Sequence, residues 1–135
     1  MYFQGTQKLI PPNRCFDGKQ LMMEDNLQLL YTPGHTLDGI SVYDQMQEAL
    51  FVGDTLEKPL VQLEEASLPE YKQTLEYFLT LPAVHFYAGH TLHLTKADMI
   101  DTLAYINALL ANKAIQFDSE EIQHIHTMNQ NAIKR

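Results

Sequence analysis

Short apolar runs separated by polar turns fill most of the first half of the chain. Runs of four or five residues are too short for stable helices and suit the strands of a half-buried sheet. We expect strands at residues 19–23, 27–31, 39–43, 49–52 and 84–87. The polar stretch Glu24-Asp25-Asn26 between the first two predicts a hairpin, and the further antiparallel connections favour a single sheet.

Apolar residues recur at helical spacing from Leu68 onward. The stripe of the first helix consists of Leu68, Tyr71, Leu75, Phe78 and Leu79. Pro82 ends this segment, because proline cannot continue a helix. Thr95 and Asp98 then open a second helix, as N-cap and capping-box partner. The stripe of this helix includes Met99, Leu103, Ile106 and Leu110.

A third helix is expected near the end of the chain, with Asp118 or Ser119 as its N-cap. Glu120-Glu121 suits the positive end of its dipole, and Lys134-Arg135 suits the negative end. Strands come first and helices afterwards in this order of elements. The sequence therefore predicts an α+β fold, with a mixed β-sheet and helices on one face.

The 135 residues suit one domain with its own core. Met1-Tyr2-Phe3-Gln4-Gly5 is typical of the remnant of a protease-cleavable expression tag, which leaves residues 6–135 as the domain. The alternative is a natural start in which Tyr2 and Phe3 follow the methionine by chance.

The charge and the cysteine content narrow the classes of function. A formal net charge of −8 argues against a general nucleic-acid surface, which needs a basic stripe. No run approaches the ~20 apolar residues of a membrane span. The single cysteine, Cys15, excludes an internal disulfide and fits a reducing compartment, so we expect a cytoplasmic protein. A nucleophilic role for Cys15 is disfavoured, since no histidine lies near it in sequence.

Three turns carry side chains that can bind a metal. His35 lies in Thr32-Pro33-Gly34-His35-Thr36, Asp54 in Gly53-Asp54-Thr55 and His90 in Gly89-His90-Thr91, each directly after an expected strand. Loops that follow buried strands can direct such ligands at one point, as a zinc or iron hydrolase requires. Alternatives remain for two of them: a loop histidine that bonds a neighbouring carbonyl, and an aspartate that caps a turn.

These motifs resemble those of the metallo-β-lactamase superfamily. Residues 29–40 resemble its T-P-G-H-T hallmark and the strand that follows. Residues 50–56 resemble F-x-G-D-x-L, and residues 88–91 resemble the last hallmark, P-G-H-G or a near variant. The resemblance covers roughly residues 17–110 and is greatest to the small glyoxalase II-like metallo-hydrolases. The H-x-H-x-D-H segment that opens such domains is absent from the sequence, so the resemblance is to the C-terminal half only.

The resemblance implies half of an αββα sandwich and a site for two zinc ions, with iron or manganese as alternatives. His35 would complete the first metal site, Asp54 would bridge both metals, and His90 would bind the second. No separate catalytic residue is implied. Each metal would keep two protein ligands in this chain, whereas catalytic zinc generally has three. We therefore expect weak metal occupancy and an inactive fragment.

The implied activity is hydrolysis of a small thioester, ester or lactone through a metal-bridged hydroxide. β-Lactam hydrolysis, iron-dependent sulfur dioxygenation and RNA cleavage are alternatives within the family. A different class of function is a non-catalytic half-domain that pairs through its open sheet face. The expected partner is then a second copy of the chain or the missing N-terminal half, because a bare apolar sheet face would otherwise meet water.

The other histidines and the tyrosines are assigned to structure. His85 is expected on a strand and His93 in a loop, although either could line a substrate site. His124 and His126 lie two residues apart on an expected helix and would point away from each other, so they could not bind the same metal ion. The tyrosines, which could line a pocket but are expected in the core, are Tyr43, Tyr71, Tyr87 and Tyr105.

Overall fold

The computed structural model describes the chain except residues 1–9, 12, 14, 16, 65–66 and 134–135. The tag remnant expected at Met1–Gly5 and the basic pair Lys134-Arg135 therefore lie outside the described residues. Everything from residue 17 onward, apart from residues 65–66 and the last two, belongs to the described part.

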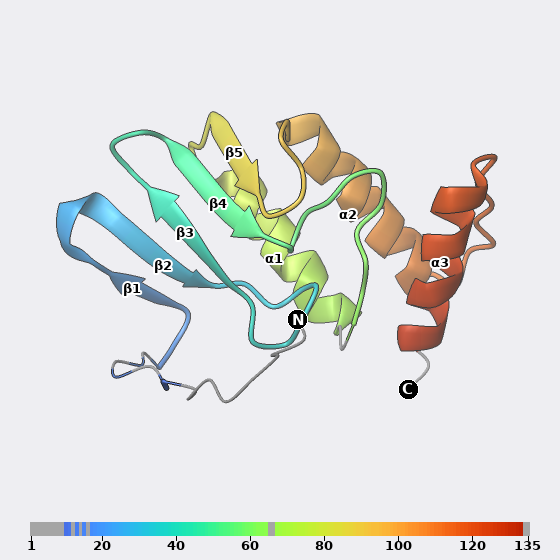
Figure 1. Cartoon of the computed structure of the whole chain (residues 1–135), viewed down its shortest axis with the longest axis horizontal. Helices are drawn as coiled ribbons and strands as arrows, with labels where there is room; N and C mark the ends of the chain where they lie inside the picture. The colour runs from blue at the N-terminus through green and yellow to red at the C-terminus, as the bar shows by residue number, and fades with distance from the viewer. Residues whose placement is uncertain (1–9, 12, 14, 16, 65–66, 134–135) are drawn as a thin grey trace.

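The described strands form one mixed sheet in the order β1-β2-β3-β4-β5 (Figure 1). Their bounds are β1 Gln20–Met22, β2 Leu27–Tyr31, β3 Ile40–Asp44, β4 Ala49–Gly53 and β5 His85–Ala88. The pairs from β1 to β4 are antiparallel, and β4 pairs with β5 in parallel. The strand predictions are confirmed within one or two residues, which is the ordinary uncertainty of element ends.

The helices lie together on one side of the sheet, and α3 is the helix farthest from β1 (Figure 1). Their bounds are α1 Leu68–Thr80, α2 Lys96–Leu110 and α3 Glu120–Ala132, with a short 3-10 turn, η1 Glu24–Asn26. The capping box predicted for α2 is present, and the Ser119 hydroxyl caps α3. None of the described helices has the length and apolar character needed to cross a bilayer. The α+β prediction is confirmed.

The core lies between the inner face of the sheet and α1 and α2. Leu30, Leu50 and Val52 point inward from the strands and are at most 1 % exposed. Leu75 and Phe78 of α1 pack against them. Burying a Leu or Phe side chain contributes roughly 1.5–3 kcal/mol each, so this layer is the main source of folding free energy.

Two details of the predicted core are wrong. Leu110 was expected on the buried stripe of α2 but is 38 % exposed, whereas Tyr105 and Leu109 are buried. The stripe is displaced because Tyr105 faces α3, a contact that helical spacing alone does not reveal. Tyr87 was expected in the core but is 48 % exposed on the opposite face of the sheet. There its ring stacks on the ring of Phe51, with the two ring centroids 4.9 Å apart.

The outer face of the sheet carries exposed apolar side chains. Successive side chains of a strand alternate between faces, so the residues opposite the core form a second surface. Among the described residues this outer sheet face includes Tyr31, Ile40, Phe51 and Tyr87, each more than 40 % exposed. The register aligns Tyr31 with Ile40 and Phe51 with Tyr87.

A buried polar network ties α3 to the rest of the protein. Asn129 donates from Nδ2 to the Val61 carbonyl at 2.8 Å and to the Tyr105 hydroxyl at 3.1 Å. Its Oδ1 accepts from the Leu63 amide at 2.8 Å. The Tyr105 hydroxyl also forms a hydrogen bond with Nδ1 of His126 at 2.9 Å. Buried polar groups paired in this way favour one docking position for α3.

His126 is neutral in the folded state, because burial lowers the pKa of its imidazole below the ordinary value. The unfolded chain takes up the proton first as the pH falls through about 6.5. The contribution of His126 to stability is therefore fully present above about pH 6.5 and is lost as the pH falls toward the folded-state pKa. We expect the free energy of unfolding, measured by urea denaturation from neutral to mildly acidic pH, to fall less in His126→Gln than in the wild type. The slopes of the free energy of unfolding against pH should differ between the two proteins by at most about 1.4 kcal/mol per pH unit.

The exposed neighbour His124 on the same helix provides the control. His124→Gln should keep the wild-type pH dependence. Parallel pH profiles for the wild type and His126→Gln would show that the buried imidazole is not responsible.

Candidate metal centre

The His35 loop connects β2 to β3 and is shaped by Gly34. A Cβ at position 34 would lie 2.5 Å from Cδ2 of Tyr71, so only glycine lets the loop pack this closely on α1. The Nδ1 atom of His35 lies 2.6 Å from the Gln62 carbonyl. A carbonyl oxygen only accepts, so Nδ1 carries the proton and Nε2 keeps its lone pair. Nε2 lies 3.9 Å from a Glu64 carboxylate oxygen.

Asp54 and His90 face each other because their strands end side by side. β4 and β5 are parallel, and the Gly89 amide donates to the Gly53 carbonyl at 2.9 Å just beyond the strands. Oδ1 of Asp54 lies 3.5 Å from Nε2 of His90. A Cβ at position 89 would collide with that Asp54 oxygen, so Gly89 is what allows the carboxylate to lie there.

Glu57 joins this pair from the loop that follows β4. Ligand atoms of Asp54, Glu57 and His90 all lie within 4.8 Å of one another. Two carboxylates so close together repel each other, and a divalent cation between them removes that cost. Glu57 was not among the metal ligands predicted from the sequence. The only signal was an acidic residue three positions after Asp54, which matches none of the recognised motifs.

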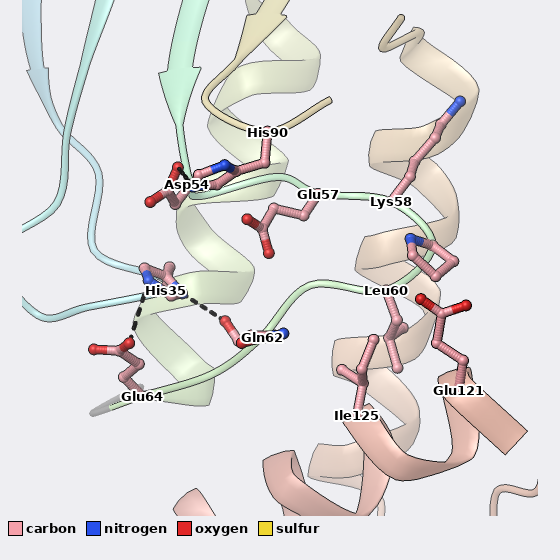
Figure 2. A pocket seen from close by; sticks show the side chains of 11 residues that line it. His35, Asp54, Glu57, Lys58, Leu60, Gln62, Glu64, His90, Glu121 and Ile125 are labelled. Carbon is pink, nitrogen blue, oxygen red and sulfur yellow. Dashed lines mark hydrogen bonds and ion pairs between the residues drawn. The ribbon is translucent and has the colours of Figure 1, made fainter. Parts of the chain in front are cut away.

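One cavity of about 420 Å³ contains all three of the sequence-predicted ligands (Figure 2). Its lining residues are His35, Asp54, Glu57, Lys58, Pro59, Leu60, Gln62, Glu64, His90, Glu121 and Ile125. His35 approaches from the side of Gln62 and Glu64, whereas Asp54 and His90 lie together at the sheet edge (Figure 2). The structure thus brings the three residues to one cavity, with His35 outside the tight group of Asp54, Glu57 and His90.

The cavity is electrostatically suited to cations. Its lining includes several carboxylates, and its lysine, Lys58, pairs with Asp98 at 2.8 Å. Burial by itself would raise the pKa of Asp98, but hydrogen bonds from Lys58 and Thr95 outweigh it and hold the pKa below its ordinary value. Figure 2 shows the Lys58 side chain running along α2, away from Asp54. A lining dominated by one sign of charge concentrates ions of the other sign.

The remaining candidates lie elsewhere. His85 is on β5 and His93 is in a loop, as expected, and neither is among the residues that line the cavity. His124 and His126 lie on α3, where His124 is exposed and His126 is buried, so they cannot share a metal. Cys15 is exposed and away from the cavity.

The sheet with helices on one face and the cation-favouring cavity at its strand ends define an α+β protein with a candidate metal centre. A family model described as the metallo-beta-lactamase superfamily matches residues 2–90. This match spans well over half of the chain, so the protein belongs to the metallo-beta-lactamase superfamily. The resemblance inferred from the three turns is confirmed, and the fold is that of a metal-dependent hydrolase.

Solved structures agree with this assignment. A metallo-beta-lactamase family protein from Thermus thermophilus is 26% identical and matches 76% of this chain and 38% of its own, with a TM-score of 0.60. The DIM-1 metallo-beta-lactamase is 19% identical over 74% of this chain and 50% of its own, with a TM-score of 0.65. An archaeal superfamily protein from Sulfolobus tokodaii is 21% identical over 80% and 45%, with a TM-score of 0.59. The chain thus spans at most half the length of these structures.

The close packing of Gly89 on Asp54 yields a test of the cavity. Gly89→Ala should displace the Asp54 carboxylate from His90, because the added methyl group occupies the position of Oδ1. We expect the affinity for added Zn²⁺, measured by calorimetry, to fall more than about 10-fold. Gln47→Ala, an exposed change in the turn between β3 and β4 that does not line the cavity, serves as the control. Unchanged Zn²⁺ binding in Gly89→Ala would contradict this role for the Asp54 carboxylate.

Proposed function

We propose that this chain forms the metal-binding part of a metal-dependent hydrolase. The supporting observation is the convergence of Asp54, Glu57 and His90 at the ends of β4 and β5, with His35 across the same cavity. Family membership suggests the reaction class, hydrolysis. The cluster fits that class, because a metallo-hydrolase requires a small set of nitrogen and oxygen ligands at one point.

The proposed ligand roles differ for the two cations. Asp54 would be shared, His35 would hold the first cation through Nε2, and His90 would hold the second. Glu57 adds a ligand to the second cation, which then has three protein ligands, the number typical of catalytic zinc. The first cation keeps two. We therefore propose one well-held cation and one weakly held one, instead of the two weak sites expected from the motifs alone.

Bound zinc would supply a hydroxide nucleophile at neutral pH and polarise a substrate oxygen. The chain's residues contribute position and charge: Asp54 and Glu57 attract the cations, and the Gln62 carbonyl holds the His35 ring. Hydrolysis by this chain alone should be weak, because the first site lacks a third ligand.

The proposed substrate is a small thioester, ester or lactone. The spacing between the His35 and Asp54 turns is short and contains no large insertion, as in the glyoxalase II-like relatives that the motifs resemble. The acidic lining of the cavity and the net charge of −8 argue against RNA, whose phosphates would be repelled.

Metal titration tests the ligand set directly. Zn²⁺ should bind the wild type with one clear site, and Glu57→Gln and His90→Gln should each lower its affinity more than about 10-fold. Glu120→Gln, an exposed change on α3 that does not line the cavity, should leave the affinity unchanged. Calorimetry under identical buffer conditions provides the comparison.

Two outcomes would overturn the proposal. Full occupancy of two sites that survive Glu57→Gln would show that the ligand set is different. Hydrolysis of a thioester panel that persists in His35→Ala and Asp54→Asn would show that these residues do not hold the reacting metals.

A second candidate function rests on the outer sheet face. Tyr31, Ile40, Phe51 and Tyr87 expose apolar area there, and no charged side chain stands beside the Phe51–Tyr87 stack in the register. In the complete αββα sandwich fold, the corresponding sheet face packs against a second sheet. We propose that a second copy of the chain occupies this surface, since an exposed apolar face is complementary to itself.

Sedimentation over a range of concentrations tests this self-association. The wild type should dimerise, and the double variant Phe51→Ser, Tyr87→Ser should be monomeric at the same concentrations. Met46→Ser removes a similarly exposed apolar side chain from the turn between β3 and β4, away from this face, and should leave the dimer intact. A wild-type monomer throughout, or a dimer unaffected by the double variant, would contradict the proposal.

A further inference from the structure

The four-residue segment 61–64 of the cavity wall lies between His35 and Asn129. Toward His35, the Gln62 carbonyl accepts from the ring at 2.6 Å, and the Glu64 amide donates to the His35 carbonyl at 3.1 Å. Toward α3, the Val61 carbonyl and the Leu63 amide both bond to the Asn129 side chain at 2.8 Å. Backbone groups of successive residues thus alternate between the two partners.

This alternation is the pattern of an extended strand with a neighbour on each side. The Asn129 amide takes the place of one neighbouring strand, with one donor and one acceptor that match the backbone groups on either side of Gln62. The position of the Gln62 carbonyl is then determined from both directions. Val61 and Leu63 are buried, which further restricts the segment.

Asn129 is well suited to this task because its own orientation is determined. Its side chain is fully buried, and the Nδ2 donors are both used, by the Val61 carbonyl and the Tyr105 hydroxyl. Reversing the amide would place Nδ2 against the Leu63 amide and Oδ1 against the Val61 carbonyl, donor on donor and acceptor on acceptor.

The consequence for His35 is chemical as well as geometric. The Gln62 carbonyl holds the proton on Nδ1 and so leaves Nε2 able to bind a metal. Partners that determine the tautomer and orientation of a metal-binding histidine typically alter affinity roughly 10–100-fold when they are lost. Asn129 lies outside residues 2–90, which the family model matches. Its side chain is nevertheless hydrogen-bonded to the residues on either side of Gln62.

We propose that Asn129 is a positioning residue for the metal centre, which sets the tautomer and orientation of His35 through the Gln62 carbonyl. The role rests on the proposed function only in so far as His35 binds a metal. The tautomer itself is a property of the protein without metal, and it can be measured separately.

Long-range ¹H–¹⁵N NMR correlations of the imidazole rings read out the tautomer at about pH 8, where imidazoles are ordinarily neutral. We expect wild-type His35 to be protonated at Nδ1 alone, and Asn129→Leu to show a mixture of tautomers. Addition of Zn²⁺ should shift the Nε2 resonance of His35, and Asn129→Leu should need roughly 10–100 times more Zn²⁺ for the same shift.

Tyr105→Phe is the matched control. It removes the hydroxyl that Asn129 and His126 share but keeps both bonds from Asn129 to the cavity wall. This variant should retain the wild-type tautomer and Zn²⁺ response at His35, even if its stability falls. Equal changes in Asn129→Leu and Tyr105→Phe would indicate a merely structural effect and would overturn the proposal.

The wild-type spectrum provides one test that needs no variant. Protonation of His35 at Nε2 in the wild type would overturn the proposal without any variant. A wild type that shows the Nδ1 tautomer but no response of His35 to Zn²⁺ would refute its ligand role, and hence the proposed function at that residue. The positioning of the ring by Asn129 would then still be judged by the tautomer of the variants.

Discussion

The parallel pairing of β4 with β5 is the constraint on which the cavity depends. Parallel strands end at the same edge of a sheet, so the residues that follow them emerge together. Here the bond from the Gly89 amide to the Gly53 carbonyl extends the pairing past the strands and holds Asp54 against His90. An antiparallel β5 would have placed His90 at the opposite edge. The crossover through α1 is what makes the parallel arrangement possible, because a hairpin cannot connect parallel strands.

Much of this arrangement could be predicted from the sequence. The strands, the three helices and the turns at His35, Asp54 and His90 follow from local periodicity and capping, which depend on near neighbours in the chain. Glu57 could not be predicted, because its approach to Asp54 depends on the path of a loop with no repeating pattern. The exposure of Tyr87 and Leu110 depends on which face meets a neighbour, and that is decided by tertiary packing. Asn129 gave no signal, since a polar residue on a helix is ordinarily a solvent contact.

The two sequence interpretations of His35, as a metal ligand or as a loop histidine bonded to a carbonyl, are compatible. The carbonyl bond uses Nδ1, and the ligand role uses Nε2. The buried polar groups of α3 are likewise paired, since each would be costly to bury alone. Nε2 of His126 is the exception among the described residues, with no hydrogen-bond partner. Its neutral state and aromatic surroundings reduce that cost.

The lengths of the outermost strands limit how the protein can aggregate. β1 has three residues and β5 has four, and they are the two edges of the described sheet. Edges this short offer a neighbouring chain few free amide and carbonyl groups, so extension of the sheet into a fibril gains little per added molecule. Aggregation at high concentration should therefore occur through the sheet faces and be amorphous, not fibrillar. Detergents that cover apolar faces should reduce it more than agents that block the addition of strands.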